Sequence, residues 1–246
     1  MSLARFRKGL FNSFKYSLFS LVLLILGSAL YYTNEVRIAR AQTPALVAQA
    51  QQNYFKTASI AKLSPEQLKI LLAIEDPKFY SHHGVDLTTP GAGMTTITQG
   101  LVKLLYYPEG FQQGIAKIRQ TLIAQYALDA LVSKEAQLDL FLNIAYFGHE
   151  QNHEIKGFVQ AAHIYFHKAL NQLNDQEFIG LVAMLIAPNK FKPGTMVHTE
   201  RVQRIQAYLA GNYQPKSVLD TDYNNHLHGS FSEEGLMGFL RLITKP

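Results

Sequence analysis

Apolar residues recur with the spacing of an α-helix along most of the chain. After residue 64, Leu68, Leu71 and Leu72 fall on one helical face, and the same face continues through position 75 to Phe79. Further segments with the helical period lie at residues 96–107, 115–131, 134–146, 156–170, 174–187 and 199–210. The alternation typical of strands is hard to find. The pattern therefore predicts a mainly α fold.

The first of these helices carries a clear start signal. Ser64 is placed to cap it, Pro65 suits its first turn, and Gln67 stands where a capping box needs a glutamine. We therefore expect the helix to begin here and to carry Glu75 on its apolar face.

The N-terminal part of the chain is apolar without a helical stripe. Residues 16–32, "YSLFSLVLLILGSALYY", carry no charge and approach the ~20 residues that cross a bilayer. Basic residues precede this run, so the positive-inside rule places the N-terminus in the cytoplasm and the bulk of the chain outside. A cleaved signal peptide is the alternative, since "ARA" at 39–41 offers small residues for cleavage. The predicted segments are a basic tail at 1–15, a transmembrane helix at 16–34, a stalk at 35–54, a globular domain at 55–212 and a polar tail at 213–246.

Charge and cysteine content exclude some classes of protein. The formal net charge is +5, but Arg5, Arg7, Lys8 and Lys15 lie together where no acid occurs, and the remainder is nearly neutral. The basic face expected of a nucleic-acid binder is therefore missing. The chain has no cysteine, which excludes disulfides and thiolate zinc sites.

The first candidate for chemistry is Glu75, within "AIEDPKFYSHHGVD" at residues 73–86. A carboxylate on an apolar helix face is costly to ionise, and the resulting rise in its pKa suits a general base. The alternative is that Glu75 lies at the edge of the stripe and is solvated or hydrogen-bonded to a neighbour. This segment alone leaves both interpretations open.

The second candidate is the turn and helix start in "GAGMTTITQGLVK", residues 91–103. The backbone N–H groups and dipole of such a helix start favour an anion, and phosphate is the obvious ligand. Gln99 and Lys103 are four residues apart and so share a helical face. The alternative is ordinary N-capping by Thr95 or Thr96, with Lys103 in solvent.

These segments resemble the motifs of the peptidoglycan glycosyltransferases, which occur as monofunctional enzymes and as the first domain of class A penicillin-binding proteins. Residues 73–86 match the first motif and "TTITQGLVK" the second, while residues 133–148 and 154–168 are similar to the fourth and fifth. The resemblance covers about residues 55–210, in the family's order. The matching structural positions are Asp76, Phe79, His82, Gly84, Asp86 and Gly148.

The resemblance implies a lysozyme-like helical fold and an inverting hexosyltransferase. In the family, the 4-hydroxyl of one GlcNAc attacks the anomeric carbon of a chain held on undecaprenyl pyrophosphate, which polymerises lipid II outside the cytoplasmic membrane. Glu75 is then the expected general base, and a divalent cation, Mg or Mn, often assists. The substrate-binding residues that the resemblance implies are Lys78, Thr95, Thr96, Thr98, Gln99, Lys103, Lys117 and Asn143.

The same resemblance sets expectations for location and partners. We expect a single-pass protein of the bacterial inner membrane, with its C-terminal domain periplasmic or extracellular. The expected partners are lipid II, the nascent glycan strand and other cell-wall synthesis proteins. After residue 212 we expect no room for a transpeptidase domain, so the enzyme is predicted to be monofunctional.

The third motif of the family departs from its usual pattern here. Its second glutamate falls at Thr121, an expected arginine at Gln113, and the usual first-motif arginine at Lys78. Lysine keeps the charge but loses the bidentate fork that grips phosphate. A catalytically degenerate protein that binds lipid II or a cell-wall partner is therefore the alternative to an active enzyme. Glu109 and Asp129 are the candidates for supplying the missing carboxylate.

The connector between the first and second motifs is also shorter than in the family. Only "LTTP" separates Asp86 from Gly91. Since the longer connector helps to wall the cleft, we expect Glu75 to be more exposed to water here.

Two other features invite a functional interpretation. "HEQNH" at 149–153 has the spacing of a zinc protease motif, which requires both histidines on one helix. The neighbouring Gly148 and the internal Asn152 disfavour that helix. Tyr106, Tyr107 and Phe111 are candidates for contact with the lipid surface, with core packing as the equal alternative.

Overall fold

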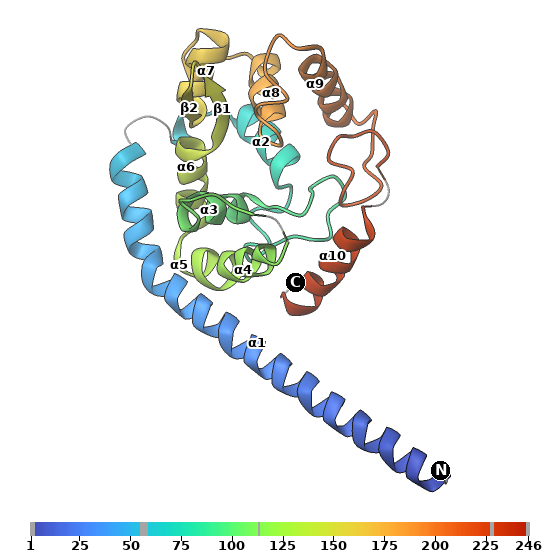
Figure 1. Ribbon diagram of the computed structural model, residues 1–246. Helices are drawn as coiled ribbons and strands as arrows, with labels where there is room; N and C mark the ends of the chain where they lie inside the picture. Colours follow the sequence, from blue (N-terminus) through green and yellow to red (C-terminus); the bar gives the residue numbers. More distant parts are fainter. Residues whose placement is uncertain (1–2, 55–58, 113, 227–228, 245–246) are drawn as a thin grey trace.

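The computed structural model describes residues 3–54, 59–112, 114–226 and 229–244, with side chains described from residue 14 onward except that of Tyr54. Gln113 and the basic side chains of the first 13 residues therefore lie outside the described part of the chain. The elements, shown in Figure 1, are α1 (Leu3–Tyr54), η1 (Ile60–Lys62), α2 (Pro65–Glu75), α3 (Ile97–Tyr106), α4 (Ala116–Ile123), the π-helical η2 (Ala124–Leu128), α5 (Asp129–Leu131), α6 (Lys134–Ile144), β1 (Tyr146–Glu150), β2 (His153–Lys156), α7 (Phe158–Phe166), η3 (Leu170–Gln172), α8 (Asp175–Met184), α9 (Met196–Leu209) and α10 (Phe231–Ile243). The mainly α prediction is confirmed.

The apolar stripes of the helices meet in one core. Leu71 of α2, Leu101 of α3 and Leu138 of α6 are fully buried. Phe158 of α7 packs edge-on against Phe147, with ring centroids 4.9 Å apart. Burial of such side chains from most of the helices and from the hairpin is the main source of stability in a chain without disulfides.

From Phe14 to Tyr31, the side chains of α1 are exposed and lie outside this core. The apolar window of α1, within Phe14–Asn53, is long enough to cross a membrane and is not buried at all. In Figure 1 the N-terminal half of α1 runs away from the domain, whereas the C-terminal half lies along it.

The segment expected as a stalk, residues 35–54, packs on the domain. Ala39, Thr43 and Ala50 are buried. The hydroxyl groups of Thr43 and Tyr106 lie 2.6 Å apart, and Glu35 pairs with Arg119 of α4. The anchor helix is therefore fixed to the domain by contacts along its C-terminal half.

In the segment 213–246, expected as a polar tail, residues 213–226 and 229–244 also pack on the domain and include α10. Val218, Asp220, Tyr223 and Leu240 are buried. Periodicity could not show this, because residues 213–226 are irregular and obtain their order from long-range contacts.

The strand pair was not predicted. β1 and β2 form an antiparallel hairpin in which Glu150 pairs with His153. The two turn residues, Gln151 and Asn152, both have positive φ, as a two-residue hairpin turn of the primed type requires. Strands of only five and four residues are too short to give a clear alternation.

Candidate active site

Helix α2 ends at Glu75, and the next residue ties that end to α3. The start signal was correct, since Ser64 and Gln67 form the predicted capping box. Asp76 is buried, and its two carboxylate oxygens have different partners: His82 Nε2 lies 2.8 Å from Oδ1, and the backbone N–H of Ile97 donates to Oδ2 at 3.0 Å. Asp76 therefore joins the first and second motifs.

The anion at the N-terminus of α3 is thus the chain's own Asp76 carboxylate. Thr96 caps the helix, accepting from the N–H of Gln99, while the Gln99 side chain accepts from the N–H of Thr96. The N-capping interpretation is confirmed for Thr96, and its hydroxyl also donates to the carbonyl of Gly84 at 2.7 Å.

Two expected substrate-binding residues lie in the interior instead of facing a cleft. Thr98 and Gln99 are fully buried. The Thr98 hydroxyl donates to Gln137 Oε1 at 2.6 Å, and Gln99 Nε2 donates to Thr121 Oγ1 at 2.9 Å. Both side chains hold α3 against its neighbours.

The environment of Glu75 is that of a desolvated carboxylate. Burial raises its pKa to about 7, the positive charge of Arg201 opposes that rise, and Asp76 adds to it. Among the residues that the structure describes, Glu75 makes no side-chain hydrogen bond, yet its surface is not fully covered. A carboxylate with a pKa near neutrality and an open lone pair suits a general base.

Arg201, on α9, is the functional neighbour that sequence reasoning missed. It is almost completely buried, and its guanidinium donates to the carbonyls of Ala183 at 2.9 Å and Thr221 at 3.0 Å, and to Asp222 Oδ1 at 2.7 Å. No local pattern marks Arg201, because its partners lie about 20 residues away in both directions.

Glu75 is half-buried, and the expectation that a short connector exposes it to water more than in the family stays a prediction. The C-terminal segment packs against the turn that follows the connector. The N–H of Gly91 donates to the carbonyl of Ser217, and the N–H of Gly93 donates to the carbonyl of Val218, both at 2.8 Å. A Cβ at Gly91 would lie 2.7 Å from the Pro215 ring. Residues 215–223 therefore wall the short turn and also hold Arg201.

The cationic half of the site lies at the other end of α3 and on α4. Lys117 is buried, and its Nζ donates to the hydroxyl of the exposed Thr95 at 2.8 Å. Burial and the nearby charge of Lys103 lower the pKa of Lys117 to about 7. Burial also lowers the pKa of Lys103, whose Nζ lies 5.3 Å from the centre of the Phe111 ring. Two adjacent desolvated cations, with no acidic partner among the described residues, are an arrangement that suits an anion.

Thr121, expected at the place of the family's second glutamate, is fully buried. Its hydroxyl donates to the carbonyl of Lys117 at 2.7 Å. Neither proposed substitute carboxylate is free beside it: Asp129 pairs with Lys134 at 2.6 Å, and Glu109 is exposed in a loop.

The remaining predicted residues are mostly structural. Phe79 and Asp86 are buried, and hydrogen bonds from Thr88 and Thr89 to Asp86 outweigh its burial, so its pKa is lowered. Gly84 and Gly148 have positive φ, and a Cβ at Gly84 would lie 2.7 Å from the Ala124 carbonyl oxygen.

Asn143 and Lys78, both expected to bind substrate, differ in exposure to solvent. Asn143 is buried and donates to the carbonyl of Asp139 at 2.7 Å. Lys78 is exposed just after α2.

The aromatic candidates are half-buried. Tyr107 and Phe111 contact each other edge-on, with centroids 5.1 Å apart, and the Arg119 guanidinium lies over the Tyr107 ring. Tyr106 contacts Thr43 of α1. These contacts are those of packing between α1, α3 and α4.

The zinc protease interpretation fails on geometry. His149 and His153 lie on paired strands of the hairpin, not on one helix. In the described part of the chain no group of three or more His, Cys, Asp or Glu side chains could hold a metal ion.

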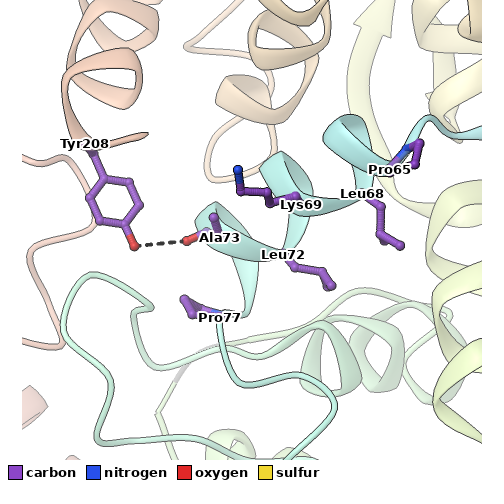
Figure 2. Close-up of a pocket in the computed structure, with 7 residues that line it drawn as sticks. All are labelled: Pro65, Leu68, Lys69, Leu72, Ala73, Pro77 and Tyr208. Carbon is purple, nitrogen blue, oxygen red and sulfur yellow. Dashed lines mark hydrogen bonds between the residues drawn. The ribbon is translucent and has the colours of Figure 1, made fainter. Parts of the chain in front are cut away.

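An open groove runs along α2 towards Glu75. Figure 2 shows Pro65, Leu68, Lys69 and Leu72 along one side of the helix, with Tyr208 reaching towards it from α9. The Tyr208 hydroxyl donates to the carbonyl of Ala73 at 3.4 Å. Leu68, Leu72 and Glu75 are at positions i, i+4 and i+7, so the groove and Glu75 share a helical face.

This helical domain, with one desolvated glutamate tied through Asp76 to a lysine pair, is a glycosyltransferase-like domain of the lysozyme-like class. The chain belongs to the transglycosylase family, whose model matches residues 42–214. It is 35% identical over 145 residues to penicillin-binding protein 1B of Buchnera aphidicola subsp. Acyrthosiphon pisum. The aligned region covers 53% of this chain and 19% of that protein. It is 30% identical over 183 residues to penicillin-binding protein 1A of Neisseria cinerea, covering 67% and 22%. Against penicillin-binding protein 1A of Escherichia coli K12 it is 30% identical over 162 residues, covering 60% and 18%.

The chain therefore spans about a fifth of the length of these relatives. The family match begins within α1 and ends before α10, so residues 215–246 lie beyond it.

Proposed function

We propose that this protein is a membrane-anchored peptidoglycan glycosyltransferase that polymerises lipid II. The observation that carries the proposal is the link through Asp76: it follows Glu75 directly and caps α3 at Ile97, two residues from the Thr95 hydroxyl that Lys117 holds. A base and an anion site are thereby fixed to one structural unit.

The proposed reaction uses these groups in order. Glu75 accepts the proton of the 4-hydroxyl of the acceptor GlcNAc, and the hydroxyl oxygen attacks the anomeric carbon of the donor. The bond from that carbon to the diphosphate oxygen breaks, with inversion. Lys103 and Lys117 stabilise the negative charge that the leaving diphosphate takes, and Glu75 then releases its proton to solvent.

The proposed location follows from α1. Its apolar half spans the bacterial inner membrane, the basic N-terminus stays in the cytoplasm, and the domain lies outside. Because the C-terminal half of α1 packs against α4 and η2, the site is held close to the membrane in which lipid II resides.

The groove beside α2 is the proposed path of the nascent glycan strand. It shares a helical face with Glu75 and presents Tyr208, whose ring suits the apolar faces of sugars, and Lys69, whose ammonium is exposed. Within the described part of the chain, Lys69 pairs only with Glu66 on the same helix, so it can donate to sugar hydroxyls.

Thr121 favours a second candidate, a lipid II-binding protein without catalysis. A buried threonine replaces the family's second acid, and loss of one catalytic partner commonly costs orders of magnitude in rate while binding persists.

The deciding experiment compares the wild-type protein with Glu75→Gln in lipid II polymerisation and in lipid II binding. Glu66→Gln, an exposed change on the same helix, is the matched control. We expect polymer from the wild type and from Glu66→Gln, and a loss of about 10²–10⁴-fold for Glu75→Gln. Binding without polymer in all three proteins would establish the second candidate, and neither binding nor polymer would overturn both.

A further inference from the structure

Helix α10 has apolar residues on two opposite faces. On the inner face Leu240 is fully buried, and the guanidinium of Arg241 donates to the carbonyl of Leu87 at 3.0 Å through Nε and at 2.6 Å through Nη2. Ser230 and Glu233 form a capping box at its start. The helix is therefore fixed to the domain in one orientation.

The outer face is apolar and has no partner among the described residues. Phe231, Phe239 and Leu242 are 96%, 45% and 81% exposed. With Gly235 and Gly238 they occupy positions i, i+4, i+7, i+8 and i+11, which form one stripe. A Cβ at either glycine would meet no atom within 4 Å.

No charged side chain interrupts this stripe. The acid Glu234 and the base Arg241 lie between the two apolar faces, and Glu233 lies on the side of Leu240. Surface helices of soluble domains normally turn a polar face to water, and a contiguous exposed apolar patch marks an interaction surface.

The position of α10 identifies the bilayer as the occupant. Figure 1 shows α10 at the side of the domain along which the N-terminal half of α1 leaves it, with α4 at the same side. Ile115, which directly precedes α4, is 78% exposed. Since α1 is one continuous helix fixed to the domain by Thr43 and Glu35, it also fixes where the membrane surface lies relative to α10.

We infer that α10 lies in the membrane interface, with Phe231, Phe239 and Leu242 inserted among the lipid chains. The inference rests on the membrane anchoring in the proposed function, but not on glycosyl transfer. Because the stripe is uncharged, insertion depends on buried apolar area and not on anionic lipid. Insertion of α10 thus gives the domain a second contact with the membrane, in addition to α1.

The absence of tryptophan from the chain allows a clean test with single reporters. The full-length protein carrying Phe239→Trp is reconstituted into vesicles of phosphatidylcholine, with or without phosphatidylglycerol, that contain a lipid with a quencher on its acyl chain. Met196→Trp, at a 77% exposed position on α9, is the matched control, since Figure 1 places α9 at the opposite end of the domain. Leu23→Trp in α1 reports the anchor itself.

We expect lipid-borne quenching at positions 23 and 239 but not at 196, in both lipid mixtures. Leu242→Glu, at an exposed site where folding is not at stake, should abolish quenching at 239 and leave it unchanged at 23. Equal access of aqueous iodide to positions 239 and 196 would overturn the inference. So would protection of position 239 from iodide without lipid quenching, which would mean that a second copy or another protein covers α10. Loss of quenching at position 23 would overturn the anchoring as well, and the polymerisation assay remains independent of all three.

Discussion

The two halves of the site, Glu75 with its neighbours and the Lys103–Lys117 pair, respond to the same cause in opposite directions. Burial disfavours charge, so it raises the pKa of Glu75 to about 7 and lowers the pKa of Lys117 to about 7. On the Glu75 side, Arg201 opposes the effect. On the lysine side, Lys103 adds to it.

That difference indicates which half of the site lacks a counter-charge and therefore suits an anionic ligand. The chain compensates Glu75 with its own buried arginine, whereas the described residues offer Lys117 only the neutral hydroxyl of Thr95. A diphosphate would supply the missing negative charge and restore the protonated form of Lys117. Thr121 is expected at the place of the family's second glutamate, which would have supplied part of the negative charge that Lys117 lacks.

The largest effect is expected from breaking the connection between the halves at Asp76. Asp76→Ala leaves the N–H of Ile97 and the ring of His82 buried without their acceptor. Each unsatisfied group costs about 1–3 kcal/mol, so the free energy of unfolding should fall by about 2–6 kcal/mol. Urea unfolding measures it. Asp76→Asn keeps one acceptor oxygen and should lose less, and equal losses in the two variants would contradict this role.

The next largest effect tests the lysine half alone. Lys117→Met removes a buried cation but keeps much of the side-chain volume, so the fold should persist. Loss of one charge-assisted contact of about 1.5–3 kcal/mol should weaken lipid II binding about 10–100-fold. Binding to lipid II in detergent measures the change. Lys190→Met, at an exposed position to which the proposal gives no role, is the control, and a similar loss there would assign the affinity to the overall charge instead.

The sequence predicts local features of this site better than its pairings. The capping boxes at Ser64 and Thr96 follow from residues three apart and were recognisable. The internal roles of Thr98 and Gln99 were not, because they depend on Gln137 and Thr121, 39 and 22 residues away.

The same limit explains the Glu75 side. The helical period placed Glu75 on an apolar face, but its desolvation also depends on Arg201 and on the C-terminal segment. In "TERVQRIQ" nothing distinguishes the buried Arg201 from the half-exposed Arg204. What distinguishes Arg201 is its hydrogen bond to the carbonyl of Thr221, which lies in an irregular segment.

A smaller effect should appear in the stability of Glu75→Gln. The folded protein retains the proton of Glu75 up to a pKa of about 7, whereas the unfolded chain releases it near 4.5. The stability from protonated Glu75 is thus fully present below 4.5 and is lost as pH rises through 7. That interval corresponds to about 3 kcal/mol, and partial exposure reduces the expected effect to about 1–2 kcal/mol.

The variant should therefore be more stable than the wild type at pH 8 and equal to it near pH 4. Thermal unfolding across this range measures the difference. A constant gap at all pH values would mean that Glu75 is not desolvated.

The smallest expected effect concerns the pH dependence of catalysis near neutral pH, where both Glu75 and Lys117 change protonation state. Catalysis needs Glu75 deprotonated, which holds above about 7, and Lys117 protonated, which holds below about 7. The pH profile of kcat/KM for lipid II should therefore be a narrow bell centred near 7, with each limb falling about tenfold per pH unit. Lys117→Arg stays charged throughout, so it should extend the alkaline limb and leave the acid limb in place. An acid limb near 4.5 would show instead that Glu75 is solvated in the working enzyme, and the contrast between the two halves would then disappear.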